Sequence, residues 1–295
     1  MSLFNRSALL DYLGPFQEDW QRKDRCRWAQ LYLEGLLQPA VGRKTIEAIA
    51  RVTAAELNLP ASNLRQALQN FIHESPWDER RLLRRYRQDL RERWPGIGTL
   101  VVEDISFLKQ GSHSVGVHRQ VCPERRRKLN CQIVVSVFLV QGDSVHPLAA
   151  RLYLPYAWHE SPSRQKAARV PLAYRSPLSR ASIALGLLDG LIAEGFGGQA
   201  LAVGASYQHS RALWEELRRR AWWPPPHFDP GGARGMGAGG VRPHDAVKRA
   251  IDELKQDFGL DHFEGRSWRG LHHHLCLVFL AYDFCQRCAA GAMRV

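Results

Sequence analysis

Residues 99–107 read Thr-Leu-Val-Val-Glu-Asp-Ile-Ser-Phe, and the fold class follows from this stretch. Apart from the acidic pair Glu103-Asp104, its residues up to position 105 are β-branched or apolar, which predicts a buried strand over 99–105. The elements predicted after it are strands at 132–141, 145–154 and 200–204, and helices at 181–194 and 210–220. Three neighbouring strands followed by a helix, a strand and a helix indicate an α/β sheet with helices packed on it.

A polar, glycine-containing stretch separates the first two predicted strands. It ends in Arg125-Arg126-Arg127-Lys128, which we interpret as the tip of a hairpin. The side chains expected inside the sheet are Val101, Val102, Ile133, Val135, Val137, Leu148 and Leu152.

The chain before the first strand has a helical pattern. From Phe16 to about Trp94 apolar residues recur at intervals of three and four, and glycine and proline are rare. We therefore expect an all-α domain over 1–95 and an α/β domain over 96–295. The helices predicted in the first domain lie at 29–37, 45–51 and 62–72, the last one capped by Ser62, and a further helix is opened by Ser75-Pro76.

That last helix carries two stripes of side chains. The apolar stripe is Leu83, Tyr86, Leu90 and Trp94, and the cationic stripe is Arg80, Arg84, Arg87 and Arg91. A cationic stripe suits contacts to DNA phosphates. Glu79, Asp89 and Glu92 offset part of the charge, which is typical of a solvated surface helix. Both interpretations stay open.

Composition limits the class of partner. The 295 residues include 41 Lys and Arg against 29 Asp and Glu, a formal net charge of +12, so an anionic partner is expected, with nucleic acid ahead of a membrane surface. No run reaches the roughly 18 apolar residues that cross a bilayer. Arg6 and Asp11 stand where a secretory segment would be apolar. We expect a cytoplasmic protein without a membrane partner.

The last third of the chain begins with a break in regular structure. Residues 222–243 are rich in Gly and Pro and are predicted to be a linker, followed by helices at 245–258 and 267–289. Cys285 and Cys288 have zinc-knuckle spacing, but a second pair that would complete four ligands is missing from the sequence. They are expected to be reduced thiols packed in a helix.

Three blocks of sequence resemble one family. They are residues 32–36, 42–50 and 75–78; residues 109–120, 130–132 and 152–155; and the run Gly-Leu-Asp-His-Phe-Glu-Gly-Arg-Ser-Trp-Arg-Gly-Leu-His-His-His at 259–274. With these blocks the chain resembles the DDE-type transposases of bacterial insertion sequences. The resemblance implies an RNase H-like mixed sheet with flanking helices, DNA as the partner, and a bacterial, nucleoid-associated location. It also makes His272-His273-His274 part of a structural signature.

The chemistry of that family needs three carboxylates that hold two Mg²⁺ or Mn²⁺ ions for attack on a phosphodiester. The resemblance places Glu103 at the first acid, with Asp104 beside it, so these two carboxylates are the candidate catalytic and metal-binding residues. The matching pattern for the second acid puts Gly204 at its position, and the pattern for the third puts Lys248 there. The linker at 222–243 replaces an insertion that family members usually carry.

Three functions are compatible with this resemblance. The leading one is a catalytically disabled transposase derivative that binds DNA through Arg119, Arg125, Arg126, Arg127 and Lys128, and through the cationic stripe. The second is an active, metal-dependent enzyme in which Glu103 or Asp104 combines with one of the acids Asp245, Asp252 and Glu253. The third is a scaffold that assembles with copies of itself or with other proteins.

Overall fold

The computed structural model describes residues 5–39, 41–58, 60–220 and 242–291. They fall into two compact units: residues up to 86 together with those from 253 onward, and residues 87–252. Helices α6 (Glu79–Arg93) and α11 (Pro243–Gln256) each run from one unit into the other. The linker predicted at 222–243 lies outside the described residues up to position 241, and Pro243 already begins α11.

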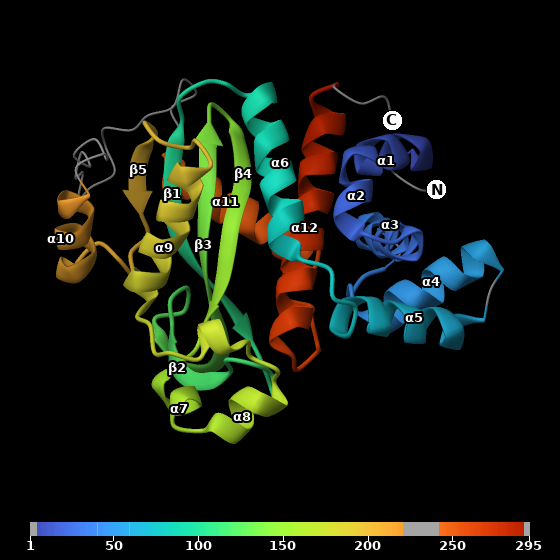
Figure 1. The fold of residues 1–295 in the computed structure, drawn as a ribbon, viewed down its shortest axis with the longest axis horizontal. Coiled ribbons are helices and arrows are strands. Elements are labelled where there is room, and N and C mark those ends of the chain that lie inside the picture. The colour runs from blue at the N-terminus through green and yellow to red at the C-terminus, as the bar shows by residue number, and fades with distance from the viewer. Residues whose placement is uncertain (1–4, 40, 59, 221–241, 292–295) are drawn as a thin grey trace. The chain divides into compact units, whose positions relative to one another are not determined.

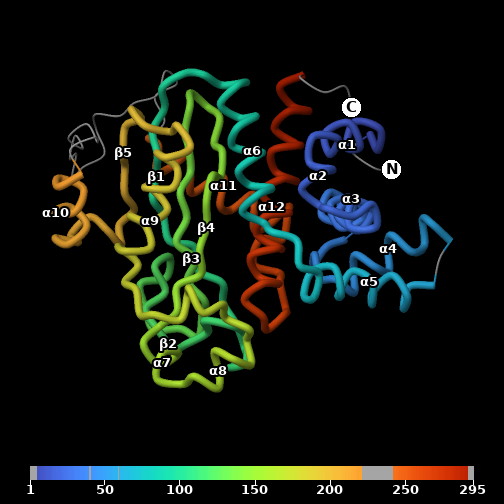
Figure 2. Tube along the Cα trace, in the orientation of Figure 1, coloured from blue at the N-terminus to red at the C-terminus, as the bar shows by residue number. Residues whose placement is uncertain are grey.

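Residues 87–252 are built around one five-stranded sheet. Its strands are β1 (Thr99–Leu108), β2 (His118–Cys122), β3 (Arg127–Gln141), β4 (Ser144–Tyr153) and β5 (Ala200–Val203). β3 pairs antiparallel with β1 and β4, and β5 adds in parallel to the other edge of β1 (Figures 1 and 2). The four strands predicted from the sequence are confirmed. The fifth, β2, lies within the polar stretch and pairs with the first residues of β3.

Helices cover both faces of this sheet. α9 (Arg180–Ala193) packs across β3 and β4, and α10 (Arg211–Arg219) packs on α9. The start of α11 reaches β1 from the opposite face (Figure 1). Three short helices follow β4: α7 (Tyr156–His159), α8 (Pro162–Ala167) and η2 (Leu172–Tyr174). A mixed sheet with helices on both faces is consistent with an RNase H-like fold.

The core of the sheet is the predicted one. Val101, Val102, Val135, Val137 and Leu148 are fully buried, and Ile133 and Leu152 are 1% exposed. The strands are apolar on both faces because helices cover both faces, so the residues do not alternate between apolar and polar.

In the other unit all the regular elements among the described residues are helices. Its elements are α1 (Arg6–Leu13), η1 (Gly14–Phe16), α2 (Gln17–Trp20), α3 (Lys23–Leu37), α4 (Ile46–Leu57), α5 (Ala61–His73) and α12 (Trp268–Ala289), with the first part of α6. The domain predicted over 96–295 includes α12 together with the sheet. The structure groups it with the amino-terminal helices, because residues 270–284 are buried on every side and α12 packs against α3 and α5.

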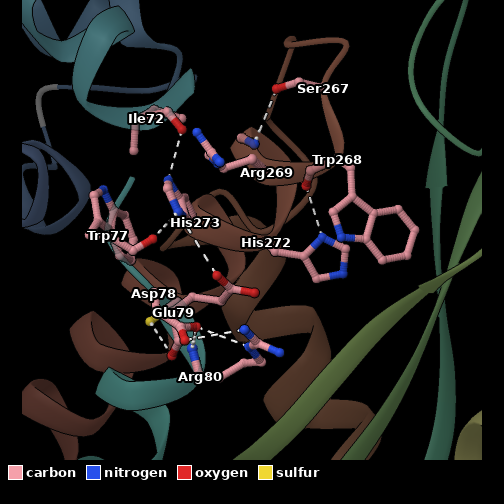
Figure 3. A network of polar contacts seen from close by, with 12 residues as sticks. Ile72, Trp77, Asp78, Glu79, Arg80, Ser267, Trp268, Arg269, His272 and His273 are labelled. Carbon is pink, nitrogen blue, oxygen red and sulfur yellow. Dashed lines mark hydrogen bonds and ion pairs between the residues drawn. The ribbon is translucent and has the colours of Figure 1, made fainter. Parts of the chain in front are cut away.

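The histidine run is part of this packing (Figure 3). The His273 ring stacks on Trp77 with centroids 3.5 Å apart, and its two nitrogens face the carbonyl oxygens of Ile72 and Trp77, each at 2.9 Å. His274 bonds to the Tyr32 hydroxyl and to the Gly259 carbonyl. These rings join α12 to distant segments of the chain, in agreement with the structural interpretation.

Two predicted helix starts are wrong. α5 begins at Ala61 after Pro60, so Ser62 lies inside the first turn. α6 begins at Glu79, and Ser75-Pro76 lies in the preceding loop. The Asp78 carboxylate accepts the backbone N–H of Arg80, so Asp78 caps the helix.

All six cysteines are free thiols, and Cys285 and Cys288 lie on α12. Among the described helices, none is long and apolar enough to cross a membrane.

Candidate functional site

The candidate site lies where β1 and β5 run side by side. Val102 pairs with Val203, and the backbone N–H of Gly204 donates to the Val102 carbonyl at 2.8 Å. Gly204 is therefore the neighbour of Glu103 on the adjacent strand. A Cβ added to Gly204 would overlap the carboxyl group of Glu103. The Glu103 carboxylate thus fills the space that a side chain at position 204 would take.

The Glu103 carboxylate faces the start of α11. His244 Nδ1 lies 3.5 Å from Glu103 Oε2. Lys248 is exposed one turn further along α11. It lies about 40° around the helix axis from His244, on the same side. Glu103 therefore faces a histidine, and Lys248 follows one turn later on the same side of α11.

Asp104 points to the opposite face of β1, because successive side chains of a strand alternate. It is 2% exposed and accepts hydrogen bonds from Arg180 Nη1 and the Tyr207 hydroxyl, each at 2.5 Å. Burial raises the pKa of the Asp104 carboxyl, and Arg180 and Tyr207 oppose that rise. Asp104 joins β1 to the first residue of α9 and to the loop after β5. The structure does not bring it together with Glu103.

The other candidate acids lie on other sides of α11 than His244. Asp245 and Asp252 are exposed, and they lie about 100° and 80° around α11 from His244. Glu253 belongs to the helical unit and forms a hydrogen bond with Tyr282. Burial is the main cause that raises the pKa of Glu253.

The residues present do not fit the two divalent ions that the resemblance implies. Gly204 has no ligand atom, Asp104 already accepts from two donors, and Glu103 faces His244. Within the described residues, no three His, Cys, Asp or Glu side chains cluster closely enough to hold a metal ion.

The predicted DNA-binding residues separate into two groups. Arg119, Arg125, Arg126, Arg127 and Lys128 lie in or beside the turn between β2 and β3, and all five are exposed. The hairpin tip predicted from the sequence is therefore present.

The cationic stripe of α6 is not one free surface, which corrects the prediction. Arg87 is 8% exposed, donates to both carboxylate oxygens of Glu194, and donates to the Leu148 carbonyl. Arg91 donates to the Glu194 carbonyl, and Arg80 pairs with Asp78. Arg84 is exposed. Arg87 forms its hydrogen bonds inside the sheet unit, because Glu194, at the end of α9, approaches this part of α6.

Two site residues were missed in the sequence. Arg180 directly follows Ser179, whose side chain caps α9. The sequence therefore predicts the start of this helix, but it does not predict that Arg180 contacts Asp104. His244 follows Pro243 and precedes Lys248 by one turn of helix. That spacing could have suggested a shared side of α11.

Comparison with known proteins gave one match. A family model described as DDE superfamily endonuclease matches residues 13–223. That range includes β1 with Glu103 and Asp104, and β5 with Gly204 after it. No curated protein and no solved structure matches the chain.

Proposed function

The chain belongs to the DDE superfamily of endonucleases, and we propose that it is a transposase derivative that binds DNA without cleaving it. The observation that carries this proposal is the contact of Glu103 with Gly204. The acid of β1 fills the place from which a second carboxylate would have to reach a metal ion.

The loss of cleavage follows from what two-metal catalysis requires. Two cations about 3.5–4 Å apart need carboxylates that converge from several elements to neutralise them. Here Glu103 faces His244, and among the described residues no three His, Cys, Asp or Glu side chains gather around a possible metal ion. Lys248, at the position matched to the third acid, adds a positive charge where a cation would have to sit. The Gly- and Pro-rich stretch at 222–243, in place of the family's usual insertion, supports the same conclusion.

Binding to DNA is supported by charge. The chain carries a formal net charge of +12, and the exposed basic residues around the turn between β2 and β3 are suited to phosphates. Such contacts position a protein on DNA and do not themselves specify a sequence.

The proposal is tested with the purified chain in two assays. Binding to mixed-sequence duplex DNA is measured over a range of NaCl concentrations, and nicking and joining of supercoiled plasmid are measured in Mg²⁺ and in Mn²⁺. We expect binding that weakens steeply with salt, with a slope near −0.9 in log affinity against log salt for each phosphate contacted, and no nicked product. Cleavage that disappears in Glu103→Ala would overturn the loss of activity, and failure to bind at low salt would overturn DNA binding.

A further inference from the structure

The β2–β3 hairpin is a two-stranded ribbon with two different faces. Cross-strand partners point to the same side, and the register pairs Arg119 with Asn130 and Val121 with Lys128. Arg119, Val121 and Lys128 are exposed, and Val121 keeps 54% of its surface in solvent. On the other side Cys122 and Cys131 are fully buried and pack with Ile133. One face of the ribbon therefore packs on the protein. The other, here called the open face, is exposed at Arg119, Val121 and Lys128, while Asn130 on the same side donates to the Lys109 and Gly111 carbonyls.

The buried face fixes the ribbon to β1. Cys122 Sγ lies 3.1 Å from the hydroxyl oxygen of Ser106, and the Glu124 carboxylate accepts the backbone N–H of Ser106 at 3.2 Å. The hairpin thus folds back onto β1, three residues beyond Glu103. At the other end of β2, Trp158 Nε1 donates to the Val117 carbonyl, and Arg164 donates to the Ser112 carbonyl. The ribbon is anchored at both ends.

The open face and the tip carry an excess of positive charge. Residues 118–131 contain five Arg or Lys and one acid, Glu124, and that acid reaches back to Ser106. Arg119, Arg125, Arg126, Arg127 and Lys128 form no ion pair within the described part of the chain.

One residue at the tip of the hairpin has a left-handed backbone conformation. Arg126 has φ +52°, in the left-handed region, where glycine is the usual residue. This residue closes the four-residue loop between Cys122 and Arg127, and its side chain is exposed at the tip of the hairpin.

We infer that the open face of the β2–β3 hairpin lies in the major groove of duplex DNA, with the tip arginines on the flanking phosphates; this rests on the proposed DNA binding. The major groove is about 12 Å wide and admits a two-stranded β-ribbon. Arg119 and Lys128 extend from the face that would meet base edges, and Arg is the side chain that most often contacts guanine there. Val121 lies on the same face and suits the methyl group of thymine.

The test compares two double variants that lose equal charge from the same unit. Arg119→Ala with Lys128→Ala changes the open face. Arg218→Ala with Arg219→Ala removes two exposed arginines of α10 and serves as the control. Binding to a mixed-sequence 40-base-pair duplex is measured alone, with methyl green, which occupies the major groove, and with distamycin, which occupies the minor groove. Thermal unfolding of each variant checks that it folds.

We expect methyl green, and not distamycin, to displace the wild-type chain, and the open-face variant to bind at least about tenfold more weakly than the control, in line with the loss of one good base contact. Equal affinity of the two variants, or competition by distamycin alone, would overturn the inference and leave DNA binding intact. If the wild-type chain does not bind the duplex at low salt, the proposed function fails as well.

Discussion

The carboxylate of Glu103 occupies the space into which a side chain at position 204 would project, so Glu103 on β1 and Gly204, directly after β5, form a complementary pair. The resemblance matches both positions to catalytic acids, and this contact links them. With a side chain at position 204, Glu103 could not keep its present conformation. Changes at one position should therefore depend on the residue at the other.

Gly204→Ala should lower the free energy of unfolding by about 0.5–1.5 kcal/mol, because the new methyl group forces the flexible end of the Glu103 side chain out of its present rotamer. In the Glu103→Ala background the same change should cost much less. A double-mutant cycle in urea measures this coupling. Gly186→Ala, where an added Cβ would meet nothing within 4 Å, is the control and should be neutral or stabilising. Equal costs of Gly204→Ala in both backgrounds would contradict the pairing.

A metal site should return only when Glu103 is shortened as well. Glu103→Asp, Gly204→Asp and Lys248→Glu together place three acids at the positions matched to the family and remove a positive charge. We expect this triple variant to bind Mn²⁺ more tightly than the wild-type chain in calorimetry, and more tightly than Gly204→Asp with Lys248→Glu, in which Glu103 still fills the space. The matched control replaces Gly204→Asp by Gly204→Asn, which keeps the shape and lacks the charge. If the control binds equally well, these positions are not the ligands.

Tyr207→Phe should destabilise the sheet unit by about 1–3 kcal/mol, because it removes one donor from the buried Asp104 carboxylate and leaves that oxygen without its bond. The comparison is Tyr156→Phe, since the Tyr156 side chain is 69% exposed and its hydroxyl can bond to water. Urea denaturation measures both variants. A cost for Tyr207→Phe no larger than that for Tyr156→Phe would mean that Asp104 is not held by this bond.

Some of these features can be predicted from the sequence, and others cannot. The strands, the core valines and the neighbourhood of Glu103 and Gly204 follow from local pattern and from the matching motifs. The spacing of apolar residues correctly predicts that Arg87 lies in a helix. Its burial is not predicted, because its partner Glu194 is more than a hundred positions away in the sequence. The return of the hairpin to Ser106 and the approach of His244 to Glu103 depend in the same way on tertiary packing, which leaves no periodic signal.

His273 should make the free energy of unfolding fall as the pH is lowered. Burial lowers its pKa to about 3, although hydrogen bonds to the Trp77 and Ile72 carbonyls favour the charged ring. The unfolded chain therefore binds a proton that the folded chain does not, between the ordinary pKa near 6.5 and about pH 3. The stabilising contribution is complete above pH 6.5 and is lost as the pH falls, by at most about 1.4 kcal/mol per pH unit.

The measurement for His273 is the unfolding free energy in urea at several values from pH 7 to pH 4. His273→Asn should be less stable at pH 7, because the stacking on Trp77 is lost, and should show a smaller fall in stability over this range. If the wild-type and variant slopes agree, the two carbonyls hold the ring charged in the folded state, and burial does not dominate.

Arg126→Gly should separate stability from DNA binding at the hairpin tip. Glycine adopts the left-handed conformation of residue 126 without strain, so the free energy of unfolding should rise by about 1 kcal/mol. The same change removes one cation, so the slope of log affinity against log salt should become shallower by about 0.9 if Arg126 contacts a phosphate. Arg169→Gly is the matched control, because Arg169 also has a left-handed backbone, with φ +54°, outside the hairpin. It should gain stability without the change in salt slope. A variant at position 126 that is more stable and binds DNA with the wild-type slope would show that the tip arginine is not a DNA contact.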